Sequence, residues 1–326
     1  TLDVTRFIRQ RWTPLAKHRS QIRYPAGRPW RPAALLLFII LLIGCARSTL
    51  PKTDHMLASG DITTLSEPVD LTYRPCRLDF FHITRFEETD NAVSAEVETA
   101  RPKGYNRVAR GTIEATPSTT GLNWRLDVTR MEVNGHQTSH RQASLTTGRF
   151  LTDHRGQKSQ WQISLPAYED TGASRLFSPA RLAGLKEDTR TLADDLVPCR
   201  LAGPVRTGDR LLRIKVHDLP QLLQRMGING RPRDLMPDLD ELVLAVEGWR
   251  PYQGRRILVA SGAHQIEFDT DRPPRHHRLE MMAVYTIDEA TSCPVTGFLH
   301  LDLQTTHLSY TRHAILRKEW GYQIVK

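Results

Sequence analysis

The chain has 326 residues, 39% of them hydrophobic, and a formal net charge of +9. Its length suits one large domain or two smaller ones. Most of the charge lies in residues 1–44, where eight Lys and Arg residues and one Asp contribute +7. From Cys45 onward the balance is only +2. This does not indicate nucleic-acid binding, which needs basic residues clustered on the folded surface, and we expect no nucleic-acid partner.

An uncharged run of 15 residues separates Arg31 from Arg47 and is strongly apolar between Leu35 and Ile43. A membrane-spanning helix needs about 20 apolar residues. The apolar part of a secretory signal has about 7–15 and follows a basic segment. The run therefore predicts a cleaved signal, with a short uncleaved signal anchor as the alternative.

The run ends in Leu42-Ile43-Gly44-Cys45, which resembles the lipobox of bacterial lipoproteins. The resemblance implies that residues 1–44 are a signal peptide and that Cys45 is the mature N-terminus, modified with acyl chains such as palmitate. It also implies a membrane-attached protein whose body faces the periplasm. Ala46 stands where lipoproteins kept on the inner membrane often carry Asp, so the resemblance implies the outer membrane. Because Arg47 occupies a position that also influences sorting in some bacteria, the periplasmic face of the inner membrane is the alternative.

Residues 45–69 are rich in Ser, Thr, Pro and Asp and show little apolar periodicity. They predict a flexible tether between the lipid and the folded body.

Residues 70–177 predict a first β half. Residues 91–100, 107–115 and 124–133 alternate apolar and polar side chains, which is typical of strands with one solvated face. Asn134-Gly135 is a strong signal for a two-residue hairpin turn. Shorter strands are predicted around Phe150 and at residues 161–165.

Residues 178–240 predict a helical connection. Leucines recur with helical spacing between residues 178 and 196. A second helix is predicted over residues 218–226, with Asp218 as its N-cap, Pro220 in its first turn and Gly227 just beyond its end.

Residues 241–326 predict a second β half with six strands. The fold class is therefore mainly β, with antiparallel sheets in an open barrel or a sandwich-like arrangement and a short helical segment in the middle. The two halves share short motifs that suggest duplication. Pro75-Cys76-Arg77-Leu78 recurs as residues 198–201, and the Thr-Gly start of residues 147–153 recurs in residues 296–302.

Three cysteines remain besides Cys45. An odd number allows at most one intramolecular bridge in an oxidising compartment. Because Cys76 and Cys199 share one sequence context, they are the predicted disulfide, with Cys293 left over. Three buried thiols are the alternative.

Catalytic and metal-binding motifs are absent, so we expect no cofactor and no metal. His136 and His140 follow the Asn134-Gly135 turn in a strand, where their spacing places them on one face but about 13 Å apart. His276 and His277 point to opposite faces of a strand. Asp238, Asp240 and Glu241 lack the spacing of a calcium loop. For two further groups of residues, a structural role is favoured over a functional one. Asp153 and Asp302 could serve as paired acids but suit turns better, and Trp124, Trp161, Trp249 and Trp320 suit a core better than a ligand platform.

Three functions fit these features. The favoured one is a non-enzymatic envelope lipoprotein whose β domain binds an envelope protein or assists its assembly. The second is a carrier of lipid or another hydrophobic ligand, which predicts an apolar cavity lined by tryptophans. The third is an envelope hydrolase, which predicts two carboxylates facing each other in a cleft.

Overall fold

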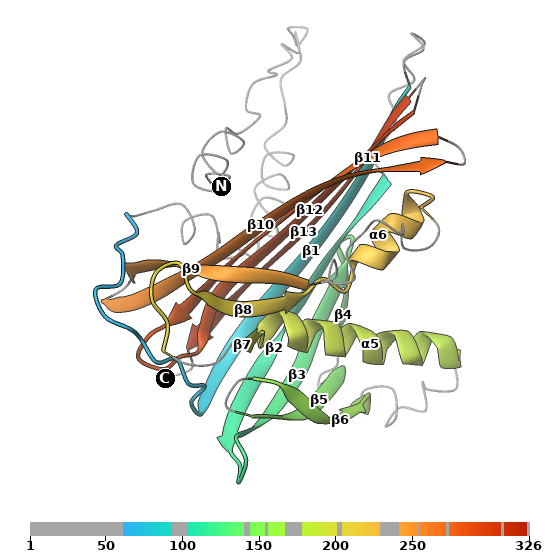
Figure 1. Cartoon of the computed structure of the whole chain (residues 1–326). Helices are drawn as coiled ribbons and strands as arrows, with labels where there is room; N and C mark the ends of the chain where they lie inside the picture. The colour runs from blue at the N-terminus through green and yellow to red at the C-terminus, as the bar shows by residue number, and fades with distance from the viewer. Residues whose placement is uncertain are drawn as a thin grey trace, which may run out of the picture. The chain divides into compact units, whose positions relative to one another are not determined.

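The computed structural model describes residues 61–92, 103–139, 144–153, 156–166, 178–200, 204–228, 241–252, 254–271, 274–307 and 310–324. They belong to one compact unit, with 13 strands and two helices among the described residues (Figure 1). The helices are α5 Pro179–Leu196 and α6 Leu219–Arg225. The strands are β1 Cys76–Ala92, β2 Lys103–Pro117, β3 Leu122–Val133, β4 His136–Ser139, β5 Thr146–Thr152, β6 Lys158–Ser164, β7 Cys199–Arg200, β8 Arg210–Lys215, β9 Glu241–Tyr252, β10 Arg255–Asp271, β11 Pro274–Asp288, β12 Pro294–His307 and β13 Tyr310–Ile324.

All 13 strands form one antiparallel sheet in the order β6-β5-β3-β2-β1-β13-β12-β11-β10-β9-β8-β7, with β4 paired to the outer edge of β3. The first and last strands pair in the middle of this order, from Leu78 opposite Ile324 to Ala92 opposite Tyr310. The two ends of the order are β6 and β7, which follow each other along the chain with α5 between them. The sheet is therefore an up-and-down barrel opened between β6 and β7, which confirms the mainly β, antiparallel fold class and its open-barrel form.

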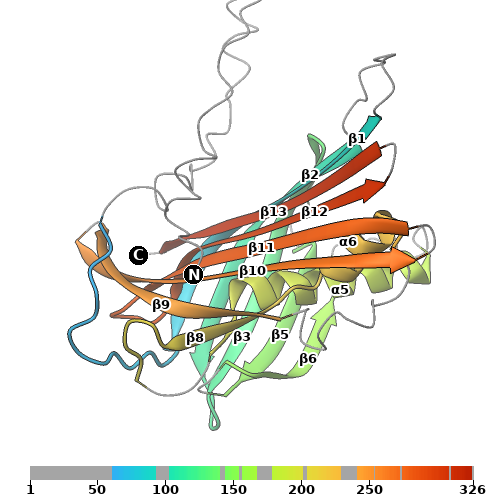
Figure 2. The same ribbon diagram turned by 45° about the horizontal axis from the view of Figure 1, so that its top comes forward.

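The opened sheet curves around its own helices. α5 contacts β5 and β6 near one end of the sheet and β8 near the other, as well as β12. Figure 2 shows α5 beside strands from both ends of the sheet. The strand sequences account for this arrangement, because every second side chain points to the helix side. On β1 these are Leu78, Phe80, His82, Thr84 and Phe86, all buried.

The helical predictions for the middle of the chain are confirmed at both helices. Pro220 lies in the first turn of α6, and Gly227 follows it with a φ of +74°. Asp218 occupies the N-cap position of α6 as predicted, but its side chain makes no cap hydrogen bond. Its carboxylate instead pairs with Lys318. None of the described helices has the length and apolar character that crossing a membrane requires.

The end of the predicted tether lies along the sheet. Thr63 and Trp249 exchange backbone hydrogen bonds of 2.8 Å in both directions, and Val69 and Val205 do the same at 2.9 Å. Thr63 and Val69 therefore attach this segment to β9 and to Val205 in the segment before β8, unlike the free linker that its composition predicted. Residues 45–60, with Cys45, lie outside the described residues.

The two predicted halves belong to one sheet. The helical connection also contributes β7 and β8 to it. The repeated motifs do not occupy matching places, because β5 lies three strands from β1 and β12 lies five strands from β7. The duplication stays a prediction, and the sheet order does not add support for it.

Gly297 provides a test of the packing inside the curve. A Cβ atom at this position would lie 2.1 Å from the indole ring of Trp320, whereas a Cβ atom at Gly184 in α5 would meet nothing within 4 Å. We expect Gly297→Ala to lower the free energy of unfolding by about 1–3 kcal/mol through overpacking. The control Gly184→Ala should raise it by up to about 1 kcal/mol through helix propensity. Denaturant unfolding measures both; equal effects of the two variants would contradict this packing.

Candidate functional site: the buried end of helix α5

The C-terminal end of α5 enters the interior of the curved sheet. Its first two turns are exposed or half-buried, whereas Leu192, Ala193, Asp195 and Leu196 are buried. This end is unusual in sequence because Asp194 and Asp195 occupy the last turn, which contains no basic residue. Carboxylates are unfavourable there, since the helix dipole places partial negative charge at the C-terminus.

Four consecutive carbonyl oxygens at this end accept hydrogen bonds from side chains of distant segments. The Tyr285 hydroxyl donates to Asp195 O at 2.8 Å, and the Tyr322 hydroxyl donates to Leu196 O at 2.5 Å. Lys158 Nζ donates to Val197 O, and the Tyr73 hydroxyl donates to Pro198 O at 2.8 Å. Carbonyls at a helix end have no partner within the helix. β11, β13, β6 and the segment before β1 therefore provide the cap that the helix sequence lacks.

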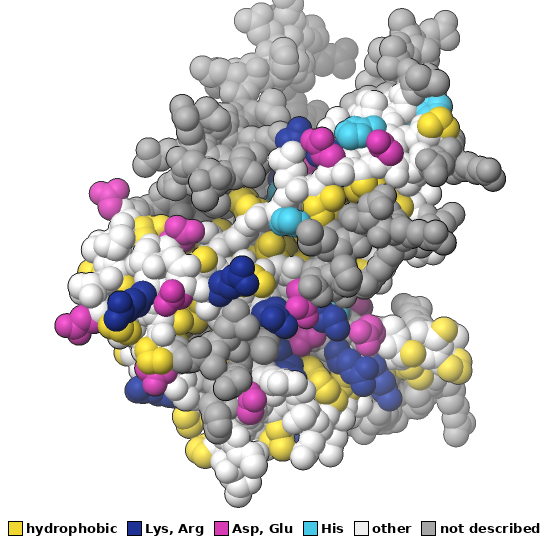
Figure 3. All heavy atoms as spheres, viewed as in Figure 1, with side chains coloured by type: hydrophobic (Ala, Val, Ile, Leu, Met, Phe, Trp, Pro, Cys, Tyr) yellow, Lys and Arg dark blue, Asp and Glu magenta, His cyan; other side chains and the backbone are white. Residues whose placement is uncertain are grey.

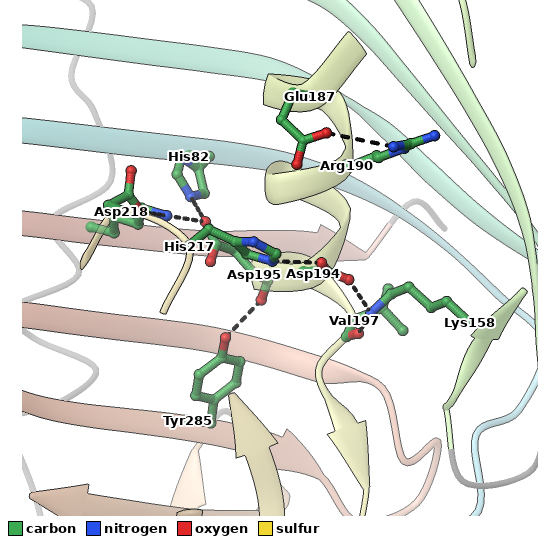
Figure 4. Close-up of polar contacts among 11 residues, drawn as sticks. His82, Lys158, Glu187, Arg190, Asp194, Asp195, Val197, His217, Asp218 and Tyr285 are labelled. Carbon is green, nitrogen blue, oxygen red and sulfur yellow. Dashed lines mark hydrogen bonds and ion pairs between the residues drawn. The ribbon is translucent and has the colours of Figure 1, made fainter. Parts of the chain in front are cut away.

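Asp195 is the centre of a buried ion cluster (Figure 4). Its Oδ2 lies 3.0 Å from His82 Nε2 on β1 and 2.9 Å from Lys318 Nζ on β13. Lys318 also pairs with Asp218, just before α6. The side chains of Lys318 and Asp195 are each 1% exposed. One ammonium group therefore joins α5, β13 and the start of α6.

The partners in the cluster keep Asp195 and Lys318 in their charged forms. Burial alone would raise the pKa of the Asp195 carboxyl, but Lys318 and His82 hold that pKa far below its ordinary value. Burial alone would lower the pKa of Lys318, but Asp195 and Asp218 raise it above its ordinary value. Burial lowers the pKa of His82 despite its bond to Asp195.

Asp194 forms a second set of contacts beside the first. Its carboxylate lies 2.7 Å from His217 Nε2 and 2.8 Å from Lys158 Nζ. Burial acts to raise its pKa, but the bonds from His217 and Lys158 lower it overall. Nearer the surface, Arg107 pairs with Asp188 at 2.9 Å and Arg190 pairs with Glu187 at 3.5 Å. Figure 3 shows basic and acidic side chains side by side in this part of the surface.

This arrangement fixes a helix and does not resemble a site open to a substrate. Asp195 and Lys318 are closed to solvent, and the carboxylate that pairs with both His82 and Lys318 is held in its ionised form. A general acid for glycoside hydrolysis needs a raised pKa and access to the substrate. Among the described residues, no group of three or more His, Cys, Asp or Glu side chains could hold a metal ion.

The other acidic candidates lie apart from each other. Asp153 sits in the turn after β5, where its carboxylate accepts a 2.9 Å hydrogen bond from the backbone of Gln157. Asp302 lies within β12, 2.5 Å from His313 Nε2. These are not paired acids across a cleft. Glu241 begins β9 and pairs with Arg213 at 3.4 Å, while Asp238 and Asp240 lie outside the described residues.

The histidine candidates are also separate. His136 is exposed in β4, and His140 lies outside the described residues. His276 is paired with Asp269 at 2.9 Å on one face of β11. His277 is fully buried on the other face, between Thr270 and Thr305 at 3.0 and 2.9 Å. The prediction that these neighbours face opposite ways is confirmed.

The four tryptophans contribute to the core. Trp124 and Trp320 are fully buried, and Trp161 and Trp249 are partly buried against the core. Trp124 donates a 2.9 Å hydrogen bond to Thr152 Oγ1. Trp320 stacks on His82 with 5.5 Å between ring centroids. The aromatic-core interpretation is confirmed for the two buried rings.

The predicted disulfide between Cys76 and Cys199 stays a prediction, because the structure does not describe the side chain of Cys199. The bond from Tyr73 to Pro198 does bring the starts of β1 and β7 near each other. Cys293 is buried just before β12.

The sequence reasoning missed Lys318, His82 and Asp195. A signal for the first two was present, because each is a polar residue at an inward position of an otherwise apolar alternation. On β13 the inward residues are Ala314, Leu316, Lys318 and Trp320. For Asp195 the signal was a carboxylate in the last turn of a helix, where the helix dipole makes negative charge unfavourable.

Breaking the ion cluster should be costly. We expect Asp195→Ala to lower the free energy of unfolding by about 3–5 kcal/mol, because it leaves Lys318 buried without one partner. The control Glu187→Ala removes the exposed partner of Arg190 in the same helix and should cost at most about 1 kcal/mol. Urea unfolding at neutral pH compares them; a small loss for Asp195→Ala would show that the cluster does not hold the helix.

Acid should destabilise the fold partly through His277. Burial lowers its pKa to about 4, below the ordinary value of about 6.5. Between these values the unfolded chain binds a proton that the folded chain does not, so stability falls as the pH drops from about 6.5 to 4. We expect His277→Asn to flatten this part of the stability profile. Equal profiles for wild type and His277→Asn would contradict the assignment.

Comparisons with known proteins add the following. No family model matches the chain, and no curated protein matches it. The chain is similar to a solved structure, that of DynF from the dynemicin biosynthesis pathway of Micromonospora chersina, at 10% identity. The match covers 82% of this chain and 94% of that one, with a TM-score of 0.20. A likeness at this level carries no argument about function.

Proposed function

We propose that this chain is a lipid-anchored lipoprotein of the bacterial envelope whose β body binds another envelope component or assists its assembly without catalysing a reaction. The observation that carries the proposal is Cys45 at the end of Leu42-Ile43-Gly44-Cys45, directly after an uncharged run too short to span a bilayer. Ala46 favours the outer membrane, with the body in the periplasm.

The geometry of the body supports a binding role over a catalytic one. Asp195 and Lys318, whose pKa values are strongly shifted, pair with each other and so hold α5 inside the sheet. Perturbed groups of this kind occur at active sites and also in structural ion pairs. Because the side chains of Asp195 and Lys318 are each only 1% exposed, the structural role is favoured here.

The anchor is tested by Cys45→Ser in the full-length chain expressed in a Gram-negative host. We expect wild type in the membrane fraction, with a mature mass that includes acyl chains, because two or more chains give stable anchoring. The variant should remain unprocessed or become soluble. Cys293→Ser is the matched control and should leave both properties unchanged. The same fractionation and mass for Cys45→Ser and wild type would refute the anchor.

Membrane destination is a separate question. We expect wild type with outer-membrane markers in a density gradient, and Ala46→Asp with inner-membrane markers. Recovery of wild type only with inner-membrane markers would refute the outer-membrane location and leave lipidation intact.

A hydrophobic-ligand carrier is the second candidate, and one observation favours it. The sheet is opened between β6 and β7, and the curve contains α5 lying over an apolar face that includes Trp124 and Phe150. An apolar ligand entering this curve would have to displace the exposed half of α5.

A cysteine pair can test that displacement. A Cβ atom at Gly148 in β5 would lie 3.3 Å from Thr189 Cγ2 in α5, so side chains at these two positions are in contact and a cysteine pair can be placed there. For a carrier, lipid extracted from the purified protein should be stoichiometric in wild type and strongly reduced in oxidised Gly148→Cys/Thr189→Cys. Reduction of the disulfide should restore uptake. Absence of extractable lipid from wild type would exclude this candidate.

A further inference from the structure

Lys318 and Asp195 are held in contact by parts of the chain that cannot easily move apart. Lys318 lies in the middle of β13, opposite Thr84 of β1 on one side and Leu299 of β12 on the other. Asp195 is held by the hydrogen bond from Tyr285 to its carbonyl and by His82 on its carboxylate. The ammonium nitrogen and the carboxylate oxygen Oδ2 are 2.9 Å apart. Holding two reactive groups in contact lowers the entropic cost of a reaction between them.

An amide between these two side chains would remove two buried charges from the site. Trp320, Tyr285 and Leu299 are all 0% exposed and lie around the pair on the helix side of the sheet. Two charges in such a place lose their hydration, and the loss offsets much of their attraction. An amide between the same two side chains carries no charge and keeps one donor and one acceptor.

A second carboxylate completes the set. Asp218 pairs with the same Lys318 ammonium group through its buried Oδ2, while its side chain as a whole is 17% exposed. Such a group can carry protons between the amine and the leaving oxygen. Asp194 is not part of this set, because its carboxylate pairs with Lys158 and His217.

We propose that Lys318 and Asp195 form an intramolecular isopeptide bond that joins β13 to α5, with Asp218 as the proton carrier. This inference goes beyond the proposed function and does not depend on it.

The step is balanced without any further reactant. Asp218 takes a proton from the Lys318 ammonium group and passes it to the Asp195 carboxylate. The neutral Nζ then bonds to Cγ of Asp195. Asp218 takes a second proton from this nitrogen and gives it to the hydroxyl on Cγ, which leaves as water when the C–O bond breaks. One ion pair becomes one amide and one water molecule, and Asp218 ends in its starting form.

Peptide mapping of the purified full-length protein tests the bond. After denaturation, reduction and alkylation, trypsin should release residues 191–200 covalently joined to residues 318–326, with a mass lower by one water than the sum of the two peptides. Trypsin does not cut after an amide-linked lysine. Free peptide 319–326 should therefore be depleted in wild type and abundant in Lys318→Arg, which keeps the positive charge.

Each outcome decides the proposal. A joined peptide whose fragmentation places the link on Asp195 supports it. A link to Asp194 or Asp218 overturns the assignment of the acceptor, and quantitative recovery of free peptide 319–326 from folded wild type overturns the bond itself. Asp218→Asn should slow formation by about 100-fold, the scale of general acid–base catalysis; formation at the wild-type rate would remove Asp218 from the mechanism. The measurement uses wild type first, so a variant that does not fold cannot decide the result.

Discussion

The structure depends on how the C-terminal end of α5 is held inside an opened barrel. A closed barrel satisfies every strand edge by pairing, but here the order of strands breaks between β6 and β7. α5 lies between these two strands in the chain and contacts β5, β6 and β8. Its last turn carries two carboxylates at the end of the helix where negative charge is unfavourable. The helix therefore needs the rest of the fold for its stability, and the opened sheet needs the helix to fill its interior.

Side chains from distant parts of the chain stabilise this end of α5. Three tyrosine hydroxyls and one lysine supply the carbonyl cap, and Lys318 and His82 compensate Asp195. A buried ion pair is a weak source of net stability, because desolvation offsets its attraction. Its value here is in specificity. Lys318 reaches Asp195 and Asp218 together only when β13 has its observed register beside β1, because a shift of one residue would turn Lys318 to the other face of the sheet.

The sequence predicted the fold class, both helices and most strands, because those features come from local alternation and helical spacing. The Asn134-Gly135 turn has positive φ angles of 50° and 83°, as a tight hairpin turn requires. The site could not be predicted in the same way, since Asp195 is 113 residues from His82 and 123 from Lys318. Asp218 shows the limit most clearly. Its position before α6 favoured a local cap, but a distant lysine provided a stronger partner than the adjacent backbone groups. A polar residue at an inward position of an apolar alternation, such as Lys318, indicates that a tertiary contact decides the structure there and not the local sequence pattern.

The pairing of β1 with β13 also bears on how the chain reaches this structure. Their ladder has 15 paired positions, as many as the β10–β11 ladder, but it joins residues far apart in the chain. While the polypeptide emerges from N-terminus to C-terminus, β2 becomes available to one edge of β1 early. β13, the partner of the other edge, is the last of the described strands to be made. An unpaired strand edge can pair with other chains and so invites aggregation. Contacts so distant in sequence also form slowly. A nascent chain of this protein would therefore expose one edge of β1 until β13 has been made, so truncation within β13 should yield insoluble material and not a smaller folded body.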